Sequence, residues 1–302
     1  MEILTIPAKN IVFKNKSPDL WFGLDYNMNI YRGCPHGCIY CDSRSDCFNP
    51  AAANKNNFDT VKVKENALQI IRDDLRRKVK TSASAYNPVV GTGAMSDPYN
   101  PLERKLNLTR NTLELLNAYE FGVSLCTKSA LVTRDIDVLT DIKSHSPVIV
   151  NISMSTCNDE LARKIEPNVS SPLERFETIS KLASSGIFCG IFLVPMLPFI
   201  TDSVEDVLQL LHLAKEAGAR YVYTYMGMTL RPGSREYFYS CLDEVLPGIK
   251  EKYIKKYGQR YNCISPNSKK LWAAFTTECE KLGLLYDMKA ITHHYKSACV
   301  LR

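Results

Sequence analysis

The stretch Arg32-Gly-Cys-Pro-His-Gly-Cys-Ile-Tyr-Cys-Asp-Ser43 places three cysteines in a C-x3-C-x2-C spacing, directly after a predicted strand at 26–31. Gly33 and Gly37 give this stretch the backbone freedom to wrap around a centre. Cysteine thiolates are the usual ligands of iron–sulfur clusters. Three thiolates leave one iron of a four-iron cluster without a protein ligand, so the spacing predicts a metal centre with an open position. The cysteines are Cys34, Cys38 and Cys41.

This spacing, with an aromatic residue just before the third cysteine, resembles the radical S-adenosylmethionine (SAM) superfamily. The resemblance implies that the three cysteines hold a four-iron, four-sulfur (4Fe-4S) cluster whose open iron binds the amino and carboxylate groups of SAM. It also implies reductive cleavage of SAM to a 5'-deoxyadenosyl radical, which abstracts hydrogen from a substrate. A reductant such as flavodoxin or ferredoxin is the expected partner, and Tyr40 is expected against the adenine.

A zinc site is the alternative interpretation of the same cysteines, with Cys47 or His36 as the fourth ligand. It predicts a non-catalytic, zinc-dependent nucleic-acid-binding protein. Zinc sites usually pair their ligands as two C-x2-C units, and only one such unit is present at 32–43. We therefore favour the iron–sulfur interpretation.

Length and composition indicate a globular protein of enzyme size. The 302 residues, 45% of them hydrophobic, suffice for one large α/β domain or for a barrel with an appendage. No window holds the ~18 consecutive apolar residues of a membrane span, so we expect no membrane association and a cytoplasmic location. The 11 cysteines lack the regular spacing of a disulfide scaffold, which favours reduced thiols. A formal charge of +6 permits nucleic acid as a partner without requiring it.

Predicted helices and strands alternate after the cysteine stretch, as in a parallel sheet wound by helices. The helices carry apolar residues at helical spacing, for example Val207, Leu210 and Leu211. The strands are apolar on both faces, which is typical of strands buried between helices and a packed interior. Helices are predicted at 65–79, 109–119, 134–144, 172–185 and 203–216, and strands at 89–94, 123–127, 148–154, 187–194 and 221–226.

With the strand before the cysteines, this pattern gives six βα units. Radical SAM enzymes fold as partial barrels of six such units, so the resemblance implies an α/β fold with a partial (β/α)6 TIM-type barrel. We expect an N-terminal arm at 1–24, the radical SAM partial barrel at 25–230 and a mainly helical C-terminal extension at 231–302, packed on the barrel. Function is expected at the carboxyl ends of the strands, where polar residues gather.

Further motifs at these strand ends look like the spore photoproduct lyase-like branch of the superfamily. They are the segment 92–101, Thr-Lys-Ser at 127–129, and Glu166-Pro167 followed by Arg175. The resemblance implies SAM contacts from several residues at matching positions. These are Ser96 and Lys128 at the amino-acid part of SAM, Asp97 beside Ser96 at the same strand end, Ser153 or Ser155 at the ribose, and Glu166 with Arg175, whose guanidinium is expected near the SAM carboxylate.

Plainer interpretations of these residues remain open at this point. Lys128 is compatible with an exposed loop lysine, and Ser153 with a small core residue. Glu166 and Arg175 are compatible with a surface ion pair of little energetic consequence.

Two positions depart from the pattern of spore photoproduct lyases. Those enzymes have a cysteine that returns a hydrogen atom to the product radical where this chain has Ala94. They also have a tyrosine directly after the third cluster cysteine, where this chain has Asp42. The resemblance therefore implies the cofactor chemistry but not the substrate, for which nucleic acid is one candidate.

The C-terminal part offers two further candidate features. The stretch 250–261 interleaves lysines with tyrosines, which is typical either of a nucleic-acid surface with Tyr253, Tyr257 or Tyr261 stacking on bases, or of an amphipathic helix with buried tyrosines. Four scattered cysteines are compatible with a second cluster or, more simply, with core positions. These are Cys241, Cys263, Cys279 and Cys299.

Overall fold

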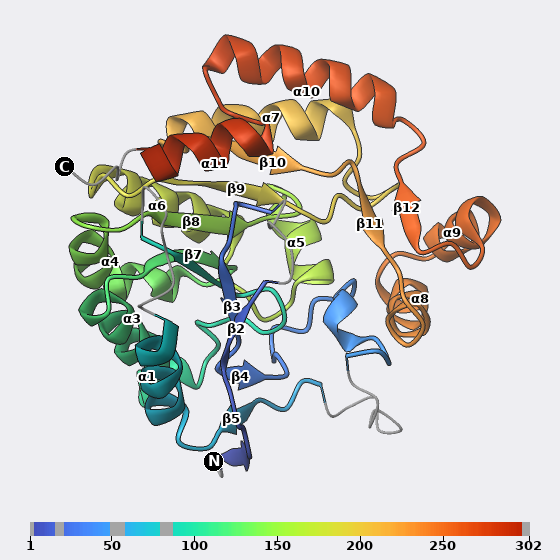
Figure 1. The fold of residues 1–302 in the computed structure, drawn as a ribbon. Coiled ribbons are helices and arrows are strands. Elements are labelled where there is room, and N and C mark those ends of the chain that lie inside the picture. Colours follow the sequence, from blue (N-terminus) through green and yellow to red (C-terminus); the bar gives the residue numbers. More distant parts are fainter. Residues whose placement is uncertain (1–2, 16–20, 49–57, 79–86, 298–302) are drawn as a thin grey trace.

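A computed structural model of the protein describes residues 3–15, 21–48, 58–78 and 87–297. Its centre is a seven-stranded sheet in the order β10-β9-β8-β7-β6-β3-β2 (Figure 1). The six strands from β3 to β10 run parallel, which confirms the partial (β/α)6 barrel. The strands are β2 (Val12–Lys14), β3 (Tyr26–Met28), β6 (Val89–Thr92), β7 (Gly122–Thr127), β8 (Val148–Ser153), β9 (Cys189–Leu193) and β10 (Val222–Thr224).

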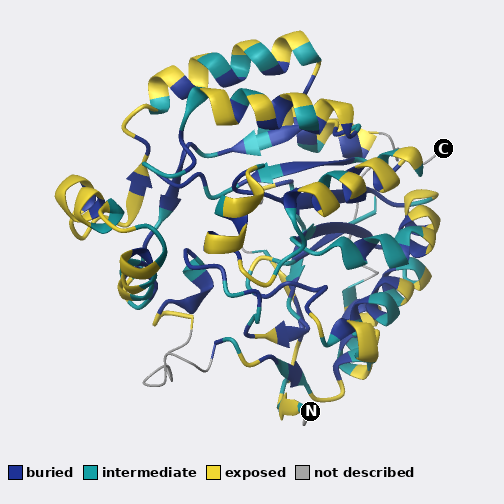
Figure 2. Cartoon of the chain, turned by 180° about the vertical axis from the view of Figure 1, so that it is seen from behind, coloured by how far each residue is buried: buried dark blue, intermediate teal, exposed yellow. Residues whose placement is uncertain are grey.

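Helices cover the outer side of this curved sheet, and their apolar stripes form the main core with the strands (Figure 1). Every residue of β8 is buried, as expected for a strand covered on both faces (Figure 2). Ser171 begins α6 with a capping box that includes Glu174. The outer helices are α1 (Ala67–Lys78), α3 (Leu108–Ala118), α4 (Ile136–Lys143), α6 (Pro172–Ser184) and α7 (Val204–Glu216), with shorter helices α2 (Glu103–Leu106), α5 (Asp159–Ile165), η1 (Asp42–Arg44) and η4 (Ala130–Asp135).

The first predicted strand, at 26–31, is divided in the structure. Its first half is β3 in the main sheet, whereas its end is β4 (Tyr31–Arg32) in a separate three-stranded sheet. There β4 pairs with β5 (Lys62–Lys64), which also pairs with β1 (Leu4–Ile6). The arm adds β2 antiparallel to β3, so part of it belongs to the main sheet. The chain thus leaves the barrel before it enters the cysteine stretch.

The C-terminal part is mainly helical, and it packs on the barrel in two places. Helix α10 (Ser268–Leu282) contacts α7, while α11 (Met288–Ser297) contacts β8. Helices α8 (Ser234–Val245) and α9 (Ile249–Tyr257) share a second hydrophobic core with Cys38, Ile39 and Tyr40. Two short antiparallel strands, β11 (Gly227–Thr229) and β12 (Asn262–Ile264), join these helices to the barrel. None of the helices in the described segments is long and apolar enough to cross a membrane.

Candidate functional site

The cysteine stretch 32–43, here called the thiol loop, is fixed by backbone hydrogen bonds to two other segments. Cys34 N donates to Phe58 O over 2.8 Å, and Ile39 N donates to Ile165 O over 3.0 Å. Gly33 has a φ of +82°, and a Cβ there would lie 2.6 Å from Phe58 O. Glycine is therefore required at this position, because any side chain would push the loop away from its partner.

The three thiols lie close enough together to influence one another electrostatically. Burial is the main reason why the pKa of Cys34 is raised to about 12, and Asp97 and Cys41 raise it further. Burial likewise raises the pKa of Cys38, with Glu166, Cys41 and Cys34 adding to the effect. Such thiols stay protonated unless a positive centre favours the thiolates, which is what a metal cluster supplies.

The three thiols are the donor set that a 4Fe-4S cluster with one open iron would use. A cluster places each thiolate on a different iron, so its ligands need not converge on one point. Within the described segments, no group of three or more His, Cys, Asp or Glu side chains is placed to hold a metal ion. The two candidates for a fourth zinc ligand have polar neighbours, since His36 Nδ1 lies 3.5 Å from Asp97 Oδ2 and Cys47 Sγ lies 3.1 Å from Ser45 Oγ.

A cavity of about 500 Å³ opens beside the thiol loop at the carboxyl ends of the parallel strands. Of the predicted site residues, Tyr40, Cys41, Lys128 and Ser153 line it. The other predicted site residues do not line the cavity. Parallel-strand barrels gather their ligand-binding groups at this end. The remaining lining residues are Trp21, Asp42, Ser43, Gly93, Ala94, Cys126, Phe192, Val194, Pro195, Tyr225, Met228, Thr229, Tyr261 and Asn262.

Lys128 brings a positive charge to the cavity. Its Nζ donates to Ser153 Oγ over 2.8 Å, and its backbone N donates to Asp97 Oδ2 over 2.8 Å. Burial alone would lower the pKa of Lys128, but Cys38 and Glu166 outweigh that effect and raise it. The interpretation as an exposed loop lysine is therefore wrong, and the side chain is a held ammonium group.

Glu166 and Arg175 form a buried ion pair behind Tyr40. Arg175 Nη2 donates to Glu166 Oε2 over 2.6 Å, and the two side chains are 1% and 0% exposed. The interpretation as a surface pair is wrong. Glu166 also accepts hydrogen bonds from Tyr40 and, over 3.1 Å, from Ser155 Oγ. Burial would raise the pKa of Glu166, but Arg175 and Lys128 hold it below its ordinary value.

All three nitrogens of the Arg175 guanidinium donate to protein groups. Besides Glu166, it donates to Ser153 O over 2.9 Å and to Ser170 O over 2.8 Å. Arg175 does not line the cavity. It therefore helps to fix the positions of Ser153, through the Ser153 carbonyl, and of Tyr40, through Glu166.

Ser96 and Asp97 connect the thiol loop to the neighbouring strand ends. Asp97 accepts from Tyr99 N over 2.8 Å and from Thr127 Oγ1 over 2.7 Å, in addition to Lys128 N. Ser96 Oγ donates to the carbonyl of Gly33 in the thiol loop. Both side chains are buried and bonded to protein, and neither lines the cavity.

The sequence did not reveal the aromatic half of the cavity, which comes from four separate elements. Trp21 lies in the arm, Phe192 in β9, Tyr225 after β10 and Tyr261 just before β12. Two signals were available: Tyr261 ends the 250–261 stretch, and Tyr225 lies at the carboxyl end of the strand predicted at 221–226. Tyr253 and Tyr257 are 0% and 5% exposed in the second core, which supports the interpretation of their stretch as an amphipathic helix and excludes these two rings from stacking on bases.

The other candidate features of the C-terminal part serve the cores. Cys263 is buried in the second core and Cys279 in the main core, which supports the interpretation as core cysteines. Cys241 is half-buried beside the second core. Cys299 lies outside the described residues.

Asp42 pairs with Arg231, whose guanidinium lies over the ring of Phe48 and over the ring of Tyr261, which lines the cavity.

Comparisons with known proteins agree with this geometry. An uncharacterized protein of Mycobacterium bovis is 33% identical over 237 residues, which cover 77% of this chain and 67% of that protein. An uncharacterized protein of Methanocaldococcus jannaschii is 30% identical over 204 residues, covering 67% of this chain and 70% of its own.

Solved structures with the same fold include radical SAM enzymes. A spore photoproduct lyase mutant superimposes with a TM-score of 0.69 at 14% identity, covering 94% of this chain and 81% of its own. A radical SAM methyltransferase from Kitasatospora setae, with a tryptophan substrate bound, gives 0.52 at 12% identity, covering 85% and 51%. Residues 28–211 match the family described as the radical SAM superfamily. The chain therefore belongs to the radical SAM superfamily and is an enzyme of radical chemistry.

Proposed function

We propose that Cys34, Cys38 and Cys41 hold a 4Fe-4S cluster and that the protein uses it to cleave SAM reductively. The bound cluster and SAM would supply a 5'-deoxyadenosyl radical that abstracts hydrogen from a substrate. One observation carries this proposal: Cys41 of the thiol loop, Lys128 after β7 and Ser153 at the end of β8 line one cavity of about 500 Å³.

The residues around this cavity have separate proposed roles toward SAM. The ammonium of Lys128 supplies a point charge for the SAM carboxylate, and the Ser153 hydroxyl, which Lys128 already contacts, supplies a polar group for SAM. The Tyr40 ring lies against the adenine, while the Tyr40 hydroxyl donates a hydrogen bond to Glu166. The remaining predicted residues do not line the cavity and act through their neighbours. Ser155 and Arg175 act through Glu166, and Ser96 and Asp97 act through the thiol loop and Lys128.

Anaerobic purification tests the cofactor part of the proposal. We expect a brown protein that contains iron and labile sulfide and forms 5'-deoxyadenosine from SAM under dithionite. Reduced flavodoxin or ferredoxin should replace dithionite as electron donor. Replacing the three cysteines by alanine should abolish iron binding, because each thiol holds one iron. Unchanged iron content in Cys34→Ala, Cys38→Ala and Cys41→Ala would refute the proposal, and stoichiometric zinc without sulfide would support the zinc alternative.

We further propose that the aromatic half of the cavity receives a flat ring of the substrate, with nucleic acid as the candidate polymer. The large rings of Trp21 and Tyr261 line the cavity, and the two residues are 44% and 42% exposed. Aromatic faces of this kind stack on nucleobases without regard to sequence. Photoproduct repair through a thiol at position 94 is not proposed, because this position in the cavity lining is an alanine.

Tryptophan fluorescence tests the ring-binding proposal. The chain has two tryptophans, so Trp272→Phe leaves Trp21 as the only reporter at the cavity. We expect adenosine, cytidine, guanosine or thymidine to quench this emission saturably, and free ribose to leave it unchanged. Trp21→Phe is the matched control, since Trp272 packs against Phe275 and Tyr286 away from the cavity lining. Equal responses of both variants, or no response to any nucleoside, would contradict ring binding.

A further inference from the structure

We infer that Glu103 is a positioning residue that fixes the thiol loop relative to the strand ends around the cofactor cavity. The inference rests on the proposed function. Glu103 belongs to a buried polar network, called here the Glu103 hub, which nothing in the proposed SAM chemistry uses. The hub consists of Tyr31, Glu103, Arg134 and Asp135.

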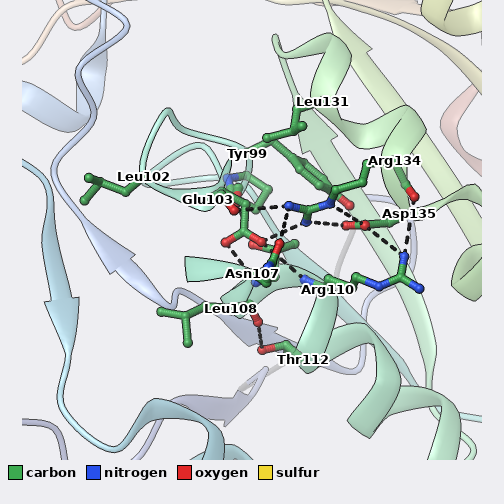
Figure 3. A network of polar contacts seen from close by, with 12 residues as sticks. Tyr99, Leu102, Glu103, Asn107, Leu108, Arg110, Thr112, Leu131, Arg134 and Asp135 are labelled. Atoms are coloured by element: carbon green, nitrogen blue, oxygen red, sulfur yellow. Dashed lines mark hydrogen bonds and ion pairs between the residues drawn. The ribbon is translucent and has the colours of Figure 1, made fainter. Parts of the chain in front are cut away.

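The Glu103 carboxylate is the meeting point of the network (Figure 3). Its Oε1 accepts from Arg134 Nη2 over 2.9 Å, and its Oε2 accepts from Thr109 N over 3.0 Å and from the Tyr31 hydroxyl. Arg134 continues to Asp135, where Nε donates to Oδ1 over 2.7 Å. Both carboxylates are 0% exposed. The carboxylate of Glu103 therefore has donors from three separate parts of the chain.

Two of the donors reach Glu103 from segments that lead into the candidate site. Tyr31 lies in β4, immediately before the thiol loop. Arg134 lies in η4, which follows the end of β7 and Lys128. Glu103 itself begins α2, only six positions after Asp97. One carboxylate thus connects three segments that continue into the thiol loop, Lys128 and Asp97.

The short segment from Asp97 to Glu103 is stiff, so the position of one residue sets that of the other. Tyr99 N and Asn100 Nδ2 both donate to Asp97, the first to its side chain over 2.8 Å and the second to its carbonyl over 3.1 Å. Glu103 N in turn donates to Asn100 O over 2.9 Å. A shift of Glu103 would therefore move Asp97, which holds the backbone of Lys128.

Stability alone does not account for such a network. Burying several charges costs desolvation, and apolar residues of similar volume often stabilise a fold equally well. Buried polar networks that are fully hydrogen-bonded do, however, specify one arrangement of the segments that they join. A site that must aim a radical at one bond needs this kind of specification. We therefore assign the hub the role of positioning the segments that it joins.

The variant Glu103→Gln tests the inference, because an amide removes the charge and one acceptor oxygen without changing the size of the side chain. Since all three thiols remain, we expect iron and sulfide content to be kept. SAM affinity should fall about tenfold, measured from the change that SAM causes in the EPR spectrum of the reduced cluster. Tyr31→Phe, which removes only the bond between β4 and the hub, should broaden the same spectrum and weaken SAM binding in the same direction.

Asp137→Asn is the matched control. Asp137 is 61% exposed and pairs with Arg110, outside the hub. It should leave the EPR response and SAM affinity unchanged.

The outcomes separate this inference from the proposed function. Wild-type protein without a SAM-responsive cluster signal would overturn both. A wild-type signal together with unchanged SAM affinity in Tyr31→Phe and in a folded Glu103→Gln would overturn only the positioning role, even if thermal stability fell. If Glu103→Gln does not fold, Tyr31→Phe decides alone.

Discussion

The buried pair of Glu166 and Arg175 shows how single residues shape this site. Arg175 supplies the charge that allows Glu166 to stay ionised at 0% exposure. We expect Arg175→Met to lower the free energy of unfolding by about 3–5 kcal/mol, because it leaves a buried carboxylate without its partner. Urea unfolding followed by circular dichroism measures this change. Lys164→Met, which breaks an exposed pair with Glu160, is the control and should have little effect.

The depressed pKa of Glu166 also predicts how stability depends on pH. A carboxyl group whose folded pKa lies below its unfolded value of about 4.3 stabilises the protein above that pH. This contribution is lost as pH falls through the folded pKa. In Glu166→Gln we expect a shallower loss of stability on acidification below about pH 4.3, measured by unfolding at a series of pH values. A slope equal to that of wild type would argue against this assignment.

At the scale of elements, the junction of β6 and β7 depends on one glycine. Gly93 has a φ of +98°, and a Cβ there would lie 1.9 Å from Cys126 O. We expect Gly93→Ala to cost about 3 kcal/mol or more, because the strand ends that line the cavity must separate. Gly248→Ala is the matched control, with a φ of +83° and no atom within 4 Å of the added carbon. It should cost only the about 1–2 kcal/mol of a left-handed residue, as measured by thermal unfolding.

The elements that the sequence predicted share a visible signal. Strands such as β8 are mostly apolar and helices such as α7 carry an apolar stripe, so six parallel strands and the main helices could be found. Strands β4 and β5 have two and three residues, too few for any periodicity. They form only because distant segments meet, and local pattern does not contain that information.

The candidate site divides in the same way. The cysteines and Lys128 belong to compact motifs and could be predicted as a group. Glu103 and Tyr31 are 72 positions apart, and neither belongs to a motif, so their contact follows only from the fold. Tyr261 belongs to the 250–261 stretch that the sequence singled out, whereas Trp21 lines the cavity from near the other end of the chain and belongs to no motif.

At the scale of the whole molecule, the second core couples the C-terminal extension to the thiol loop. Phe238 is 0% exposed, lies 5.2 Å from the ring of Tyr253 and belongs to the same core as Cys38 and Tyr40. We expect Phe238→Ala to cost about 3–5 kcal/mol. Hydrogen exchange should rise in the thiol loop as well as in α8, while β8 stays protected. Faster exchange confined to α8 would show that the extension and the loop are independent.

The thiol loop is also completed by residues that are synthesised late. Ser234 Oγ donates to the carbonyls of Cys41 and Asp42 over 3.2 Å each, and Asp46 N donates to Pro232 O. These partners emerge from the ribosome almost two hundred residues after the cysteines. If the proposed cluster were delivered during translation, Ser234 and Pro232 would not yet be present to make these contacts. We therefore expect the maturation machinery to load iron and sulfur onto the finished chain.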